Sequence, residues 1–572
     1  MNDNRNMLLA IVLSAFVLIG WSLLSDKFFP TPPPQTHKVE NGKVQPTPAP
    51  VTEAGSPKGG PEPLRPRELV LGETPRLKIE TPQLTGSINL KGARFDDLDL
   101  VTQRETIKKD SPPVRLLSPA RAKDSYFAQF GWSGQGVAVP DANSLWTASA
   151  PTLVPGQPVT LSWSNPTGQR FELILSVDDG YMFTVKQRVV NGGSNAVGLR
   201  TYGLASRSAK SPDPSTWTNH VGPMSFLADK ADYSVDWDTL DENKAGVTRD
   251  SRGGWLGFTD KYWLTALIPA DGAPVEASFR KSESGAYQAD FAGSQFVAAP
   301  GQAVTSEARL FAGAKEKKFL DRYENEGITK LSKSIDWGWF EWFMRPIFNL
   351  LTWLFSVLGN FGLAIISLTF IVRLILFPIA DKQFKSMAGM RKVQPKMKAL
   401  QERYKDDKPK LQQEMLKLYQ EEKINPAAGC LPILLQIPIF YALYKVLMVS
   451  VEMRHQPFYL WIKDLSAPDP LTPVNLFGLL PFTPPGFLAI GVLPILLGIT
   501  MWIQFKLNPQ QMDPVQQQIF SFMPWILMFV MAPFAAGLQL YWVVSNLLTI
   551  AQQTWLYKRY DMHLSDTHPV KT

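Results

Sequence analysis

The chain of 572 residues has one cysteine, five histidines and few of the patterns that mark enzymes. A single cysteine excludes an internal disulfide, so any part outside the cytoplasm must be stable through its packed core alone. No CxxC, CxxCH or HExxH sequence occurs, which argues against a metal or haem enzyme. A G-x-x-x-x-G-K-[ST] loop is also missing. We therefore expect no enzyme activity, no cofactor and no nucleotide hydrolysis.

Positive charge is present, but most of the net charge of +7 comes from one segment. Residues 381–430 hold twelve Lys or Arg against seven Asp or Glu. This excess is typical of a cytoplasmic loop under the positive-inside rule. Apolar residues at helical spacing on both sides of a KDDKP turn predict a basic helical hairpin. The hairpin either packs on itself or offers a Met-rich docking surface to a ribosome or an emerging polypeptide.

Long apolar runs predict six transmembrane helices. The first, Met7–Leu24, is longer than the core of a typical signal peptide and no small-x-small cleavage site follows, so we interpret it as an uncleaved anchor. Five further runs are Phe361–Ile379, Leu431–Ser450, Phe487–Phe505, Ile519–Phe534 and Leu538–Tyr557. An even number of spans places both termini on one side, and the basic segment 381–430 makes that side cytoplasmic.

The region between the first two spans is of a different kind. Residues 30–66 contain eleven prolines and predict an extended linker. Residues 67–330 alternate apolar and polar positions between Gly, Pro, Asn and Asp breaks, which predicts a large antiparallel β-sandwich. Its tryptophans, among them Trp132, Trp146 and Trp163, suit core packing better than a binding groove.

The predicted fold class is a polytopic α-helical membrane protein with six transmembrane helices, five of them forming the core, and a large periplasmic antiparallel β-sandwich domain. The predicted segments are an N-terminal anchor at 1–29, a Pro-rich linker at 30–66, the β-sandwich domain at 67–330, an interfacial amphipathic helix at 331–359, the second transmembrane helix at 360–380, the basic hairpin at 381–430, four further transmembrane helices with their loops at 431–557, and a cytoplasmic tail at 558–572.

Arg373 stands within the apolar run LTFIVRLILFP. A charge at this depth is costly, although a long side chain can extend to the headgroups. Polar side chains at a similar depth are either hydrogen-bonding contacts between helices or the lining of a hydrated cavity. Because the predicted spans contain no Asp or Glu, an acidic group on a visiting chain would supply the counter-ion of the arginine. The candidate substrate-binding residues are Arg373, Thr369, Gln436, Thr500, Gln504, Trp542, Asn546, Thr549 and Gln553.

Several long motifs resemble the YidC family of membrane protein insertases, in particular its Gram-negative type. They are TFIVRLILFP, QPKMKALQERY, EEKINPAAGCLPILLQIPIFYALY, PFYLWIKDLSAPDP, FMPWILM and GLQLYWVVSNLLTIAQQ. The resemblance implies an insertase and chaperone of the bacterial inner membrane with a hydrophilic groove, lined by Arg373, that is open to the cytoplasm and to lipid. It also implies nascent inner-membrane proteins as substrates, action alone or with the Sec translocon, and contact with membrane lipids.

Three features depart from that pattern. Trp542 stands where Gram-negative relatives carry a tyrosine, the outer loop Ala467–Gly486 is longer than expected, and the C-terminal tail is short. Ribosome contact is therefore expected through the cytoplasmic loops, at 381–430 and 506–518. Two other classes of function remain as alternatives: a transporter or channel with an inward-facing polar cavity, and a structural scaffold of the envelope. A transporter is expected to carry an intramembrane carboxylate or internal repeats, and neither is visible.

Overall fold

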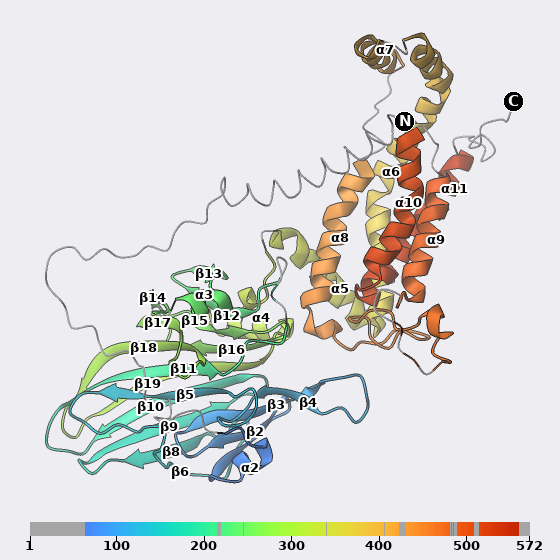
Figure 1. Cartoon of the computed structure of the whole chain (residues 1–572). Coiled ribbons are helices and arrows are strands. Elements are labelled where there is room, and N and C mark those ends of the chain that lie inside the picture. Colours follow the sequence, from blue (N-terminus) through green and yellow to red (C-terminus); the bar gives the residue numbers. More distant parts are fainter. Residues whose placement is uncertain are drawn as a thin grey trace. The chain divides into compact units, whose positions relative to one another are not determined.

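The computed structural model describes residues 63–559, apart from short gaps at 214, 216–218, 244, 339, 405–406, 423–430, 481, 483, 485–488 and 508–513. Predictions for the anchor at 1–29, for the linker up to residue 62, for Cys430 and for the tail beyond Arg559 concern residues outside this part of the chain. The described residues form a region of β-strands followed by a region of helices (Figure 1).

The β region consists of two sheets. The first runs in the order β14 (Val247–Arg252), β17 (Pro274–Lys281), β18 (Tyr287–Ala298), β11 (Val197–Arg207), β5 (Tyr126–Gly134), β3 (Arg94–Arg104), β2 (Leu84–Asn89), β1 (Arg76–Glu80) and β7 (Thr152–Leu153), with β4 (Pro113–Leu117) paired to β3. The second runs in the order β13 (Lys230–Asp232), β12 (Gly222–Leu227), β15 (Trp255–Thr259), β16 (Trp263–Ile268), β19 (Ala303–Ala314), β10 (Met182–Asn191), β9 (Gln169–Val177), β8 (Val159–Ser164) and β6 (Thr147–Ala148).

The predicted β-sandwich is confirmed. Side chains from both sheets form a shared core, where Phe95 of one sheet meets Phe183 of the other with ring centroids 5.3 Å apart. The strand pairs are antiparallel apart from the short parallel contact of β1 with β7. Trp132 and Trp146 are buried and stacked on each other, so these two tryptophans belong to the core. Three short helices complete the region: α2 (Arg67–Leu71), α3 (Trp237–Glu242) and α4 (Lys317–Asn325).

An amphipathic helix, α5 (Glu341–Leu358), leads into the helical region. Its buried residues Met344, Phe348, Leu351 and Leu354 recur every three or four positions, which places them on one face. Trp342 and Trp353 are exposed. Gly359 ends the helix in the left-handed conformation, with a φ of 67°, and the Asn360 side chain then accepts a hydrogen bond from the Leu363 backbone N–H at the start of the next helix.

The helical region contains α6 (Phe361–Arg403), α7 (Lys408–Glu421), α8 (Leu431–Val449), α9 (Val492–Leu507), α10 (Pro514–Met531) and α11 (Ala536–Arg559). Helix α6 is one continuous helix of 43 residues, about 65 Å long, whereas the sequence predicted a span followed by a separate hairpin arm. Pro378 and Pro395 lie within it, and neither ends it. The charged residues that follow Ala380 are good helix formers, so the helix continues beyond its apolar part.

Length and composition single out one candidate membrane span among the described residues, Phe361–Lys382 in α6. Shorter apolar helical stretches cover Gln436–Val449, Val492–Leu507 and Ser521–Met531. The predicted number of six spans therefore stays a prediction. Exposed apolar side chains are nevertheless frequent on these helices; examples are Leu374, Ile437, Trp502, Phe529 and Leu547. Such surfaces are typical of helices that face lipid.

Candidate functional site

Helix α11 is central to the site because it contacts α6, α8 and α9. The helix starts at a turn that is closed by Gln539, whose amide donates hydrogen bonds to the carbonyls of Met531 and Phe534, both at 2.9 Å. Lys558 and Arg559 lie in its last turn, where positive charge is favourable near the free carbonyl groups. Polar residues along α11 are thereby held opposite three neighbouring helices.

The first polar contact joins α6 to α11. Arg373 is half-buried, and its guanidinium Nη2 donates a hydrogen bond of 2.6 Å to the Ser545 hydroxyl. Phe370, Leu374 and Ile375, which flank the arginine on α6, are exposed. Within the described part of the chain, Arg373 forms no ion pair with a carboxylate. The cation is therefore held by a neutral hydroxyl, which stabilises a positive charge less than an acid does.

The second and third contacts join α8 and α9 to α11. Gln436 donates its side-chain N–H to the Tyr541 hydroxyl at 2.6 Å, and Trp542 packs on Phe440 with ring centroids 4.7 Å apart. On the α9 side, the Asn546 amide donates to the Thr500 hydroxyl at 3.1 Å. Polar groups of four helices thus meet along α11, and each of these hydrogen bonds is made to a neutral group.

The remaining predicted site residues take other positions. Thr369 is buried and donates to the Ile365 carbonyl of its own helix at 2.7 Å, so its hydroxyl does not reach across helices in this structure. Thr549 donates in the same way to the Ser545 carbonyl at 2.7 Å. Gln553 is buried in the last turns of α11, and Gln504 is half-buried near the end of α9. The structure therefore brings Arg373, Gln436, Thr500, Trp542 and Asn546 against partners on other helices.

Sequence reasoning missed Tyr541 and Ser545. The predicted residues Trp542, Asn546, Thr549 and Gln553 recur every three or four positions on one helix face. Tyr541 and Ser545 lie one position before two of them and face α8 and α6. A prediction that also included polar residues at the edge of this helix face would have named both. Relatives of the Gram-negative type were expected to carry a tyrosine at the position of Trp542. In this structure the neighbouring Tyr541 supplies a phenolic hydroxyl to the polar contact instead.

A second cation was also missed. Lys445 of α8 is 1% exposed, and its ammonium group lies 3.6 Å from the carboxylate of Asp336, which precedes α5. Asp336 also accepts a hydrogen bond from the His220 backbone N–H at 3.1 Å and thereby ties this helix to the β region. Among the described residues, no group of three or more His, Cys, Asp or Glu side chains is arranged to hold a metal ion.

Comparison with known proteins decides the family. The profile described as "60Kd inner membrane protein" matches residues 353–563, and "YidC periplasmic domain" matches residues 76–350. A membrane protein insertase YidC of Zymomonas mobilis is 49% identical over 562 residues, covering 98% of this chain and 96% of its relative. The chain belongs to the YidC family of membrane protein insertases.

Other YidC insertases give the same result. A relative from Methylobacterium nodulans is 44% identical over 584 residues and covers 98% of this chain, with 95% of its own length matched. One from Rhizobium etli is 43% identical over 583 residues, covering 99% of this chain and 97% of the relative. The predicted family is therefore confirmed, and the β-sandwich matches the periplasmic domain of YidC. YidC insertases are in general not enzymes.

Proposed function

We propose that this chain inserts proteins into the bacterial inner membrane through a hydrophilic groove along α11 that is open to the cytoplasm and to lipid. The observation that carries the proposal is the position of Arg373 among neutral partners on helices whose other faces are exposed and apolar. A half-buried guanidinium whose partner is a hydroxyl gains stabilisation when an acidic group approaches it. The polar tail of a substrate supplies such a group.

The proposed topology has six transmembrane helices with both termini in the cytoplasm and the β-sandwich in the periplasm. Support comes from the basic excess at 381–430 and from the exposed apolar side chains of α6 and α8–α11. In this arrangement the charged continuation of α6 beyond Ala380, together with α7, extends into the cytoplasm. These two segments and the loop 506–518 are where we expect ribosome contact.

The mechanism follows from the cost of moving polar groups through lipid. Crossing a full hydrocarbon core removes water from every peptide group of the substrate tail, and a polar notch reaching part-way shortens that path. Arg373 attracts acidic residues of the tail, while Gln436, Tyr541, Asn546 and Thr500 offer neutral donors and acceptors. The apolar segment of the substrate then partitions into lipid, and this favourable transfer drives insertion.

Two features favour the groove over a transporter or channel. Ion-coupled transport relies on an ionisable carboxylate within the membrane, and the predicted spans contain no Asp or Glu. The polar contacts are also short hydrogen bonds between single side chains rather than a ring around a pore. We further propose that the chain acts alone on small substrates and with the Sec translocon on larger ones, as is typical of the family.

The test is insertion of a small single-span protein with an acidic tail into liposomes that contain the full chain. Protection of the tail from protease measures insertion. We expect Arg373→Ala to reduce insertion at least about tenfold, because loss of one charge-assisted contact costs roughly 1.5–3 kcal/mol. Arg373→Lys should retain most of the activity. Normal insertion by Arg373→Ala, at equal incorporation into liposomes, would rule out an electrostatic role for this residue.

Matched controls separate charge from structure. Lys382→Ala removes an exposed positive charge near the end of the same apolar stretch and should leave insertion unchanged. A substrate whose tail acids are replaced by the corresponding amides should insert equally well with wild type and with Arg373→Ala. If this neutral substrate still requires Arg373, the arginine acts on the fold of the groove and not on the tail.

A further inference from the structure

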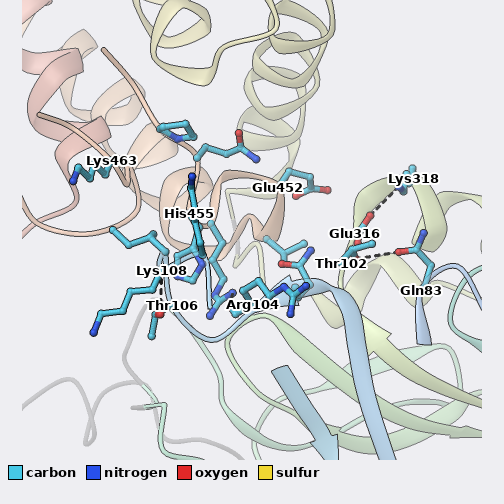
Figure 2. Close-up of a pocket in the computed structure, with 17 residues that line it drawn as sticks. Gln83, Thr102, Arg104, Thr106, Lys108, Glu316, Lys318, Glu452, His455 and Lys463 are labelled. Atoms are coloured by element: carbon cyan, nitrogen blue, oxygen red, sulfur yellow. Dashed lines mark hydrogen bonds and ion pairs between the residues drawn. The ribbon is translucent and has the colours of Figure 1, made fainter. Parts of the chain in front are cut away.

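Two neighbouring cavities lie where a loop of the β region meets the segment that follows α8. The guanidinium of Arg454 donates hydrogen bonds to the backbone carbonyls of Arg104 at 2.5 Å and Glu105 at 3.2 Å. These bonds hold the β3–β4 loop against the segment Val451–Lys463. The first cavity has a volume of about 650 Å³ and is lined by residues of both (Figure 2).

The first cavity is strongly cationic. Its lining includes six basic side chains and two carboxylates, and Figure 2 labels four of the basic residues. The basic residues are Arg104, Lys108, Lys109, Lys318, Arg454 and Lys463, and the acids are Glu316 and Glu452. Burial, together with the nearby Arg454, lowers the pKa of His455, which also lines the cavity.

Both carboxylates already have partners. Glu316 accepts a hydrogen bond from the Tyr181 hydroxyl at 2.6 Å and pairs with Lys318 at 3.1 Å. Glu452 accepts from the Lys317 backbone N–H and the Ser450 hydroxyl, both at 2.8 Å. Lys108, Lys109 and Lys463 form no ion pair within the part of the chain that the structure describes. The excess positive charge of the cavity is therefore available to an anion.

The second cavity is different in character. It measures about 620 Å³ and shares Thr106, Ile107, His455 and Lys463 with the first, so the two adjoin. Most of its other lining is apolar: Trp461, Ala467, Pro468, Pro470, Leu471 and Phe477. It also includes two acids. Asp464 is held by the backbone N–H of Ser466 at 2.8 Å, and Glu105 lies at the rim in the exposed loop.

The apolar wall is fixed in place and continues into an apolar loop. Asp469 accepts hydrogen bonds from the backbone N–H groups of Leu471 at 3.0 Å and Leu493 at 2.7 Å, which pins the loop to the start of α9. A side chain at Gly491 would collide with Asp469, because its Cβ would lie 2.6 Å from the aspartate Cβ. Beyond this base, Leu476, Leu479 and Phe482 are exposed, and residues 470–505 contain no charged side chain.

From this juxtaposition we propose that the paired cavities bind one anionic phospholipid. Its phosphate lies in the basic cavity among Lys108, Lys109 and Lys463, and its glycerol and upper acyl carbons lie in the apolar cavity against Leu471 and Phe477. The uncharged segment 470–480 rests in the adjoining lipid surface. A lipid is favoured over an acidic peptide because half of the site is apolar and continuous with this loop. The site is separate from the groove, so binding here and insertion are tested independently.

Native mass spectrometry of the detergent-solubilised full chain tests the proposal. The probes are short-chain phosphatidylglycerol, short-chain phosphatidylcholine and inorganic phosphate. We expect one phosphatidylglycerol to bind at least about tenfold more tightly than phosphatidylcholine, since three exposed cations each contribute modestly. The variant Lys108→Gln/Lys109→Gln/Lys463→Gln should lose this preference. Lys78→Gln/Lys123→Gln/Lys230→Gln removes three other exposed lysines of the β region and should keep it.

A second variant tests the apolar half. Phe477 has a φ of 60°, a conformation that asparagine tolerates, so Phe477→Asn removes the ring with little backbone strain. It should weaken phosphatidylglycerol several-fold and leave inorganic phosphate unaffected. Equal binding of the two lipids, or an unchanged preference in the triple lysine variant, overturns the anion site. If inorganic phosphate competes with the lipid at equal concentration, the apolar cavity does not contribute to binding and the ligand is not an amphiphile. If a glutamate-rich peptide binds more tightly than the lipid, the choice of a lipid as the ligand is wrong.

Discussion

Arg207 in the β region and Arg373 in the helical region have partners of different kinds. In the β region Arg207 lies 3.1 Å from Asp260 and is covered by the rings of Tyr126 and Trp237, so the charge has both an acid and two aromatic faces. In the helical region Arg373 has the Ser545 hydroxyl. A buried charge with an acid is satisfied within the fold, whereas one held by a neutral group keeps a capacity to attract an anion.

Lys445 lies in the helical region as Arg373 does, but it forms an ion pair with a carboxylate. Its partner, Asp336, comes from the segment between the β region and α5. Lys445, which lies beside the β region, is therefore neutralised by an acid of the chain, whereas Arg373 has a neutral partner. This difference agrees with a structural role for Lys445 and a substrate-facing role for Arg373.

The largest expected effect is the loss of a paired acid in the β region. Asp260→Asn leaves the Arg207 guanidinium buried without its counter-charge, so we expect a loss of about 3–5 kcal/mol in the free energy of unfolding. Urea unfolding of the detergent-solubilised full chain, followed by tryptophan fluorescence, measures it. Glu307→Gln breaks exposed pairs with Lys186 and Arg309, each at 3.7 Å, and should cost less than about 1 kcal/mol. Equal losses in the two variants would show that burial does not set the value of these pairs.

A smaller effect concerns Lys315, a buried lysine that donates to Thr259 at 3.0 Å and to the Asp260 carbonyl at 2.9 Å. Burial lowers its pKa from 10.5 to about 8, an effect that the nearby Asp260 and Asp336 only partly offset. Between those two pH values the unfolded chain binds more protons than the folded one, so stability rises with pH. We expect Lys315 to contribute a gain of about 2 kcal/mol from pH 7.5 to pH 9.5.

The variant Lys315→Met isolates that contribution. Urea unfolding at the two pH values gives a difference for wild type and a difference for the variant, and the gain attributed to Lys315 is the first minus the second. Buried tyrosines such as Tyr233, whose pKa is raised by burial, titrate above this range and are common to both proteins. A variant with the same pH dependence as wild type would mean that the lysine keeps its ordinary pKa in the fold.

Sequence patterns predicted the two regions with different success. The predicted alternation between Gly and Asp breaks is confirmed at Asp178, Asp179 and Gly180, since β9 ends at Val177 and β10 begins at Met182. The order of strands in each sheet was not predictable, because partners such as β10 and β19 are distant in sequence and are selected by core packing. Local alternation therefore identifies a sandwich, and tertiary contacts decide its topology.

In the helical region the sequence identified Arg373 because a charge in an apolar run is conspicuous. It did not identify Ser545 or Tyr541, because hydroxyls occur in many helices without any role across an interface. Lys445 was missed for another reason. Its partner Asp336 lies outside the helix, so no pattern within the apolar run pairs the two residues. Side-chain partners on other helices are the part of the site that needs three-dimensional structure.

The smallest expected effect tests the neutral partner of Arg373. Ser545→Ala removes one hydrogen-bonding hydroxyl, so we expect a loss of about 1 kcal/mol in the free energy of unfolding. Because the arginine keeps its charge and can still attract an acidic tail, we expect insertion of an acidic-tailed substrate to stay within about twofold of wild type. Thermal unfolding and the liposome assay measure the two quantities. Ser521→Ala, which removes an exposed hydroxyl bonded to the Gln518 carbonyl of its own helix, is the matched control. If Ser545→Ala reduces insertion as strongly as is expected for Arg373→Ala, the hydroxyl and the guanidinium act as one unit. The cation is then a structural element of the groove, as Arg207 is of the sandwich.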